Sequence, residues 1–182
     1  MKFELSRGDW AAALFFATGM ILGCHGGPQR KLPAKAPFIA LERDFQGFQS
    51  WETVDISKRP GGIQTHESPD AQEYINQQPP TGSKQFPVGT ILVKSTKKEA
   101  GKQDIFAMVK RGDGYNAKGA PGWEWFELTR RPDQSLAIVW RGMNPPDGQG
   151  YGGLPSGGCN DCHRNARGND FVHARQLASS KI

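Results

Sequence analysis

Four segments in the middle of the chain are rich in β-branched and aromatic residues that partly alternate with polar ones. They are residues 86–94 (FPVGTILVK), 104–111 (DIFAMVKR), 123–129 (WEWFELT) and 135–141 (SLAIVWR). This composition and spacing predict β-strands, because such side chains fit a pleated and partly buried surface. The connections at 111–122 and 130–134 are rich in residues that form turns, which favours antiparallel neighbours.

The third segment indicates how the two faces of the sheet differ. Successive side chains of a strand point to opposite faces. One face then carries Trp123, Trp125 and Glu127. The other carries Glu124, Phe126 and Leu128.

Helical signals are short. Ser68 and the proline after it predict an N-capped helix over residues 70–77, which two further prolines end. Residues 142–158 are too rich in glycine and proline for regular structure and predict a loop. A helical turn is expected over residues 159–167, followed by a short terminal element over 169–176.

Composition narrows the fold class. The 182 residues include 23 Gly and 13 Pro, which penalise helix interiors and argue against a helical bundle. Ten Phe, five Trp and three Tyr argue against disorder. We therefore expect an α+β fold, mainly antiparallel β, with one sheet-based domain and a few short helices. The net charge is +5, but basic and acidic residues are interspersed, so we expect no nucleic-acid partner.

The N-terminal segment is typical of an export signal. Residues 10–22 (WAAALFFATGMIL) are uncharged and apolar, follow Lys2 and Arg7, and are fewer than the roughly 20 that span a bilayer. The sequence Ile-Leu-Gly directly before Cys24 resembles the lipobox of bacterial lipoproteins, which implies cleavage before this cysteine and diacylglycerol on its sulfur. An ordinary signal peptide cut elsewhere, or a short uncleaved anchor, is the alternative.

These signals divide the chain into three parts. Residues 1–23 form a signal peptide of the lipoprotein type, 24–43 a tether rich in Gly, Pro and basic residues, and 44–182 the folded domain. The domain is expected in the periplasm or at the extracytoplasmic membrane surface, anchored to the membrane if Cys24 is acylated.

The strongest chemical signal is the sequence CNDCH near the C-terminus. Cys159 and Cys162 have the spacing that attaches a haem through its two vinyl groups, and His163 is then placed as an axial ligand of the iron. The sequence therefore predicts one covalently attached haem c on a C-terminal attachment segment. A structural zinc site and a thiol-redox site are the alternatives, although no zinc-finger spacing and no early βαβ context accompany the motif.

The group on the other side of the iron bears on function. No methionine follows His163, which disfavours the arrangement of a class I electron-carrying cytochrome. Met108 and Met143 precede the motif and are candidate sixth ligands. An open face on the iron suits ligand binding or catalysis, whereas two strong protein ligands suit electron transfer.

The order of several motifs resembles the cytochrome P-460 family and its cytochrome c′-beta relatives. They are Phe-Pro-Val-Gly-Thr-Ile-Leu-Val-Lys at 86–94, Met-Val-Lys-Arg at 108–111, Gly-Trp-Glu-Trp-Phe at 122–126, the haem motif, and Asp-Phe-Val at 170–172. The resemblance covers about residues 44–176. It implies a mainly antiparallel β fold with a single haem c.

The resemblance also implies two activities. In cytochrome P-460 a lysine at the position of Lys94 is bonded to the haem ring, and the enzyme oxidises hydroxylamine to nitrogen oxides. Cytochrome c′-beta binds nitric oxide without being that enzyme. Ser95 departs from the acidic residue expected after the lysine, which weakens the enzyme assignment.

Hydroxylamine oxidation releases protons, so a carboxylate or histidine is expected near the ligand. The candidates are His66, Glu67, Asp113, Glu124 and Glu127. Of these, His66 and Glu124 are taken with Lys94 as the candidate catalytic residues. Candidate partners of the haem propionates are Lys110, Arg111 and Arg164.

Three hypotheses remain open. The first is a haem-dependent oxidoreductase that oxidises hydroxylamine or a related nitrogen compound and passes electrons to an external acceptor such as a soluble cytochrome. The second is a non-enzymatic nitric-oxide-binding protein or an electron carrier. The third is a structural or thiol-redox lipoprotein without haem. The family resemblance further implies a homodimer.

Overall fold

The computed structural model describes residues 36–56, 70–97, 103–147, 149 and 158–178. The chain divides into two units, Met1–Leu32 and Pro33–Ile182, and every described residue belongs to the second. The expected signal peptide, Cys24 and residues 24–35 of the expected tether lie outside the described residues. No helix among the described residues has the length and apolar character needed to cross a membrane.

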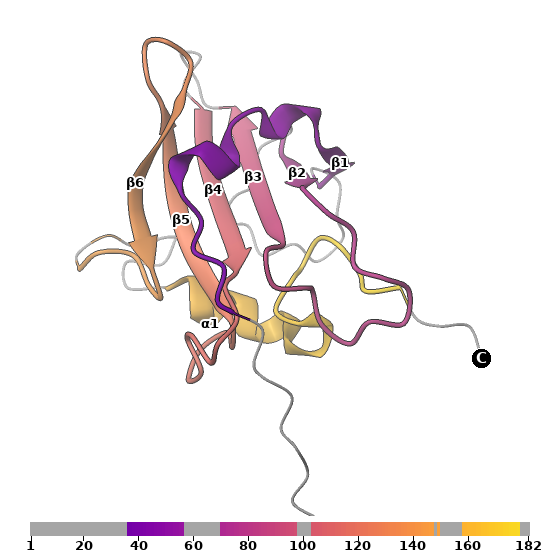
Figure 1. The fold of residues 1–182 in the computed structure, drawn as a ribbon. Helices are drawn as coiled ribbons and strands as arrows, with labels where there is room; N and C mark the ends of the chain where they lie inside the picture. The colour runs from indigo at the N-terminus through magenta and orange to yellow at the C-terminus, as the bar shows by residue number, and fades with distance from the viewer. Residues whose placement is uncertain (1–35, 57–69, 98–102, 148, 150–157, 179–182) are drawn as a thin grey trace, which may run out of the picture. The chain divides into compact units, whose positions relative to one another are not determined.

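A six-stranded antiparallel sheet forms the centre of the second unit (Figure 1), with strand order β1-β2-β3-β4-β5-β6. The strands are β1 (Glu52–Asp55), β2 (Gln72–Ile75), β3 (Ile91–Lys97), β4 (Gln103–Lys110), β5 (Trp123–Arg130) and β6 (Leu136–Gly142). The helices are short: the 3₁₀-helices η1 (Glu42–Phe45), η2 (Phe48–Ser50) and η4 (Arg164–Asn169), and the α-helix α1 (Cys159–His163). The α+β, mainly antiparallel fold expected from the sequence is confirmed.

The four expected strands correspond to β3–β6, but two further strands were not predicted. The helix expected over residues 70–77 is wrong, because residues 72–75 form β2 between β1 and β3. Ala71, Glu73 and Ile75 are buried at every second position, which is the period of a strand. Ser68 and Pro69, the expected start of that helix, lie outside the described residues.

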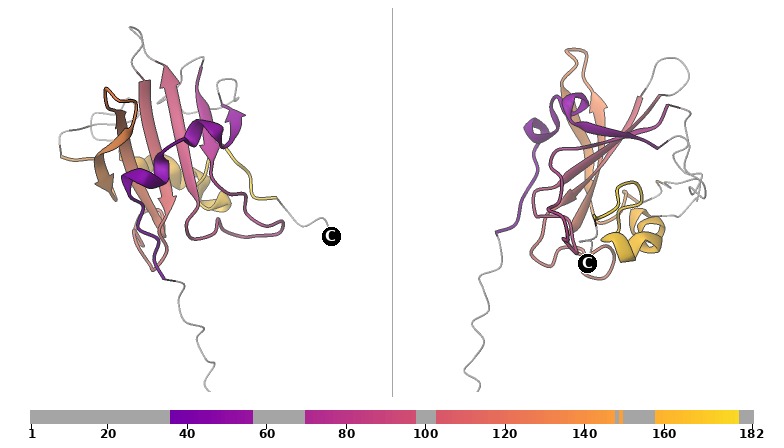
Figure 2. Two further views of the ribbon diagram at one scale, coloured as in Figure 1. Left: turned by 45° about the horizontal axis from the view of Figure 1, so that its top comes forward. Right: turned by 90° about the vertical axis from the view of Figure 1, so that its right-hand side faces the viewer.

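The two faces of the sheet pack against different covers (Figure 2). η1 and η2 lie on one face, and α1 and η4 lie on the opposite face. We call the first the core face; its cluster comprises Ala40, Phe45, Phe48, Ile91, Val93, Ile105, Ala107, Val109, Phe126, Leu128 and Leu136. We call the second the cavity face; its cluster comprises Ile75, Phe86, Leu92, Met108, Ala120, Trp123, Trp125, Trp140 and Val172.

Alternation along β5 agrees with the sequence analysis. Trp123 and Trp125 belong to the cavity face, whereas Phe126 and Leu128 belong to the core face. The core-face packing also includes residues before position 44, since Ala40 is completely buried.

A β-bulge changes the alternation in β6. Its register with β5 shifts between Glu127 and Leu128, so Ile138 pairs with Leu128 while Trp140 pairs with Glu127. The extra residue, Val139, is 53% exposed. A bulge inserts one residue into one strand and re-aims the side chains beyond it. Ile138 therefore packs on the core face, and Trp140 packs on the cavity face.

Candidate functional site

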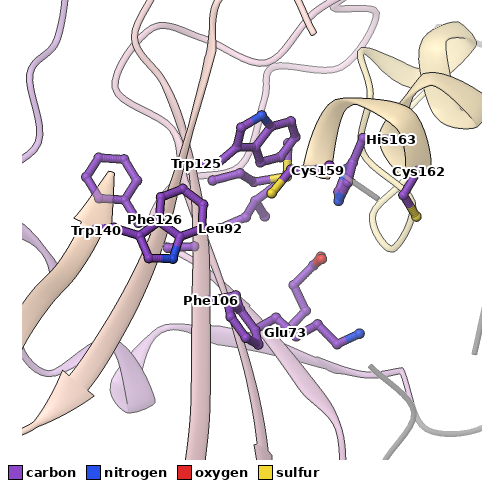
Figure 3. A pocket seen from close by; sticks show the side chains of 13 residues that line it. Glu73, Leu92, Phe106, Trp125, Phe126, Trp140, Cys159, Cys162 and His163 are labelled. Atoms are coloured by element: carbon purple, nitrogen blue, oxygen red, sulfur yellow. The ribbon is translucent and has the colours of Figure 1, made fainter. Parts of the chain in front are cut away.

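A cavity lies between the cavity face of the sheet and α1 (Figure 3). It holds about 720 Å³, open solvent at its mouth included. Its sheet-side lining residues include Glu73, Leu92, Lys94, Phe106, Met108, Trp125 and Trp140, and its helix-side lining residues are Gly158, Cys159, Cys162 and His163. A largely apolar concave wall with a few polar groups is typical of small-molecule and cofactor sites.

The helix that carries the CNDCH motif is held to the sheet through Asn160. Its Oδ1 accepts hydrogen bonds from Asn116 Nδ2 at 2.8 Å and from Trp125 Nε1 at 3.0 Å. Its Nδ2 donates to Asn116 Oδ1 at 3.1 Å and to the carbonyl of Met143 at 3.0 Å. Asn160 and Asn116 are both buried. This reciprocal amide pair fixes the position of α1 over the cavity.

Gly119 makes room for the amide pair. A Cβ at this position would lie 2.3 Å from Asn160 Nδ2 and 2.5 Å from Asn116 Oδ1. Any larger residue at position 119 would therefore displace one of the two amides.

His163 is oriented by the backbone that follows α1. Its Nδ1 lies 2.7 Å from the carbonyl oxygen of Phe171. Because a carbonyl only accepts, Nδ1 carries the proton, and Nε2 is the nitrogen suited to bind a metal. Metal-ligating histidines are usually held by such a bond. The ring of Trp125 packs beside the imidazole, with ring centres 4.6 Å apart.

Both cysteines of the motif are present as thiols and line the same cavity as His163. Burial is the main cause that raises the pKa of Cys159, to about 12. No cluster of three or more His, Cys, Asp or Glu side chains suited to a metal ion occurs among the residues that the structure describes.

The donor set and the cavity fit a haem c. Two thiols two residues apart, an imidazole with Nδ1 already engaged, and a wall of large apolar side chains are the groups that such a cofactor requires. Of the candidate sixth ligands, Met108 lines the cavity, whereas Met143 is 50% exposed and is not among the lining residues.

Lys94 and Glu73 line the cavity from adjacent strands. The two residues are directly opposite each other in the β2–β3 register, and Lys94 is opposite Phe106 on β4. Glu73 is only 7% exposed, and its Oε1 lies 3.8 Å from Arg175 Nε. The sequence analysis missed Glu73 because it placed this segment in a helix. In the sequence only the weak alternation of Ala71, Glu73 and Ile75 with polar or aromatic residues points to a strand here, and pairing with β3 is what establishes it.

Glu124 has a different environment from the one expected. It is 2% exposed and is not among the residues that line the cavity. Arg141 Nε and Nη2 donate to its two carboxylate oxygens at 2.8 and 2.7 Å, and Arg111 lies 3.4 Å away. Because Trp123 and Trp125 both belong to the cavity face of the sheet, the residue between them points to the core face. The geometry gives Glu124 a structural function there.

The other candidate proton acceptors do not line the cavity within the described residues. His66 and Glu67 lie outside those residues. Asp113 is exposed in a turn, and Glu127 accepts a hydrogen bond from Trp140 Nε1 at 2.8 Å.

The expected propionate partners are engaged with protein carboxylates. Lys110 is bound to Asp170, and Arg111 lies in the pair with Glu124. Arg164 is exposed and lies 3.7 Å from Asp161.

Comparisons with protein-family models, with curated proteins and with solved structures gave no match.

Proposed function

We propose that this chain is an exported monohaem c-type cytochrome of the cytochrome P-460 type. Cys159 and Cys162 would hold the haem through thioether bonds, and His163 would be the axial ligand. The observation that carries the proposal is that His163 is hydrogen-bonded through Nδ1 and lines one cavity together with both cysteines and Lys94. Export is supported by the apolar segment at residues 10–22, and membrane attachment by the lipobox-like sequence before Cys24.

The haem, when bound, supplies an iron that binds a small nitrogen compound and transfers electrons. The protein's contribution is the cavity around it. Leu92, Phe106 and Trp125 make this part of the wall apolar, which would limit water around a small ligand. We propose hydroxylamine, or a related compound, as the substrate.

Proton removal must accompany this reaction. Oxidation of hydroxylamine to nitric oxide releases one proton for every electron, and the electrons pass to an external acceptor such as a soluble cytochrome. Glu73 replaces Glu124 as the proposed proton acceptor, because it is a buried carboxylate in the cavity wall. Arg175, at 3.8 Å, keeps a positive charge beside it.

Lys94 is the proposed site of a bond to the haem ring. The bond would replace one N–H of the lysine and one C–H of the ring, and the released electron pair would pass to an oxidant such as a peroxide. Its place in the cavity wall supports this proposal. Such a bond would change the electronic properties of the haem, through which a protein tunes iron chemistry.

A second candidate function is nitric oxide binding without turnover. Leu92, Phe106, Met108 and Trp140 make much of the wall apolar, which suits a neutral diatomic ligand. The departure from the family pattern at Ser95 also favours this alternative.

The test is the absorption spectrum of protein produced with a cytochrome c maturation system, together with the Lys94→Arg variant. The oxidoreductase predicts a strongly red-shifted ferrous Soret band that Lys94→Arg returns to an ordinary haem c position, with loss of hydroxylamine turnover and with haem still attached. Lys118→Arg, on an exposed turn, is the matched control and should change neither.

Each other outcome has a distinct meaning. An ordinary ferrous spectrum in the wild type, with nitric oxide binding and no turnover, supports the second function. Absence of haem under these conditions contradicts both.

A further inference from the structure

The turn that holds His163 has an unusual backbone. Asp170 and Phe171, directly after η4, have φ values of 50° and 66°. Left-handed backbone is uncommon for residues other than glycine, and for a bulky side chain such as Phe it is an outlier. Such conformations persist only where the surroundings enforce them, and they cluster at functional sites. Here the second residue supplies the carbonyl that accepts the hydrogen bond from His163.

Asp170 is held at three atoms. Its Oδ1 accepts a hydrogen bond from Lys110 Nζ at 2.7 Å, and its Oδ2 accepts one from the backbone N–H of Phe86 at 2.9 Å. Its carbonyl accepts a hydrogen bond from Trp123 Nε1 at 2.7 Å. These contacts join the turn to β4, to β5 and to the segment before β3. The left-handed conformation is thus enforced from the sheet.

Lys110 is itself enclosed. Its side chain is 6% exposed, its Nζ donates to the carbonyl of Pro121 at 3.1 Å, and it lies 4.9 Å from the ring centre of Trp123. Burial lowers the pKa of Lys110, and the hydrogen bond to Asp170 opposes that change. A Cβ at position 122 would come within 3.1 Å of Lys110 Cε. Glycine at this position therefore leaves the space that the buried lysine side chain occupies.

The burial of this ion pair is weak evidence that stability is its main role. Buried ion pairs are often no more stabilising than well-packed apolar residues of similar volume, because both charges must be removed from water. The Lys110–Asp170 pair does, however, fix the turn whose carbonyl orients the predicted axial ligand.

We propose that Lys110 and Asp170 are positioning residues that set the hydrogen bond between His163 and the Phe171 carbonyl. Through that bond they would control how strongly the imidazole donates to the iron. A hydrogen bond at Nδ1 raises the basicity of a ligating histidine, and ligand basicity tunes the metal. The inference rests on the proposed haem site but not on hydroxylamine as the substrate.

The test uses the haem-loaded protein with Lys110→Met, which removes the charge but keeps an unbranched apolar side chain. A weaker bond from His163 should lower the ferrous iron–histidine stretching frequency in resonance Raman spectra and make the midpoint potential more positive. Asp170→Asn should shift both quantities in the same direction but less, because asparagine tolerates left-handed backbone and can still accept from Phe86 N–H. This variant also provides a readout if Lys110→Met fails to fold.

The matched control is Arg141→Met, which breaks the ion pair with Glu124 on the core face. It should lower stability and leave the Raman band and the potential unchanged. The inference is overturned if the Lys110 and Asp170 variants fold, retain haem and show wild-type values for both readouts, or if Arg141→Met shifts them equally. Failure of the wild type to attach haem would instead overturn the proposed function.

Discussion

The two faces of the sheet come from the same strands but differ in what packs on them. The core face is made of aliphatic side chains and Phe, and η1 and η2 cover it. The cavity face carries three Trp residues and the chemically active groups of the site. Alternation along the strands gives each face its own set of side chains, and the two covers bury both sets. On the cavity face the cover includes α1, whose CNDCH motif contributes two thiols and an imidazole to the cavity lining.

The two covers are also attached differently. On the core face, Gln46 at the end of η1 exchanges two hydrogen bonds with the backbone of Leu136, both at 3.0 Å. On the cavity face, α1 is attached through the buried amides of Asn160 and Asn116. Both covers thus use side-chain hydrogen bonds, but the core-face cover also buries Phe45 and Phe48 in a continuous apolar cluster, whereas the buried residue of α1 is the polar Asn160.

The largest expected effect tests the apolar packing of the core face. Phe126 is 1% exposed, and its ring centre lies 5.1 Å from that of Phe45. Phe126→Ala should lower the free energy of unfolding by about 3–5 kcal/mol, the range for a buried Phe→Ala substitution. Urea-induced unfolding measures the loss. Phe106→Ala, at a half-buried position in the cavity wall, is the comparison and should lose less.

This prediction distinguishes the faces directly. An equal or larger loss of unfolding free energy in Phe106→Ala would mean that the cavity wall is packed as tightly as the core face, and the contrast between the faces would be wrong.

A smaller effect is expected from the polar attachment of α1. Asn160→Ala leaves Asn116 Oδ1 and Trp125 Nε1 without the buried partner that each has in Asn160, which costs about 1–3 kcal/mol for each unsatisfied group. We expect lower stability in urea and a reduced fraction of chains with attached haem. Asn165→Ala, an exposed change in η4 directly after α1, is the control. Full haem attachment in Asn160→Ala would show that the amide pair does not position the motif.

The sequence predicted those parts of the molecule that follow from local pattern. Four strands, the alternation of Trp125 and Phe126, and the helical turn at the haem motif each depend on residues close together in the chain. The N-capping pattern at Ser68 outweighed the weaker alternation around Glu73, so β2 and the carboxylate it places in the cavity were both missed. Only pairing with β3, which is distant in sequence, identifies that strand.

Other site features depend on three-dimensional contacts. The bulge that turns Trp140 to the cavity face has no glycine to mark it, and its extra residue is Val139. Glu124 was a reasonable candidate proton acceptor from its type alone, but Arg141 binds it on the opposite face. Residue type and local spacing are enough to predict the haem motif, whereas the proposed proton acceptor depends on which strands lie beside it.

The smallest expected effect is a pH-dependent contribution to stability from the carboxylate of Glu42, which attaches the core-face cover and has no counterpart in the amide pair that attaches α1. Glu42 in η1 accepts hydrogen bonds from Arg131 Nη2 at 2.8 Å and from the N–H of Ile138 at 3.1 Å. These bonds hold the pKa of Glu42 below its ordinary value of 4.5. Its contribution to stability is therefore present above pH 4.5 and is lost as pH falls through the lower pKa of the folded state.

Urea unfolding of the wild type and of Glu42→Gln at several pH values measures this contribution. The difference in unfolding free energy should be small at neutral pH, because Glu42 and Arg131 are both partly exposed. It should shrink as pH falls below 4.5 and vanish once pH is below the lowered pKa of the folded state. Asn160→Ala removes contacts made by groups that do not titrate, so its difference from the wild type should stay constant over the same range. A Glu42 difference that persists at acid pH would mean that neutral hydrogen bonding, and not the carboxylate charge, attaches η1 to β6.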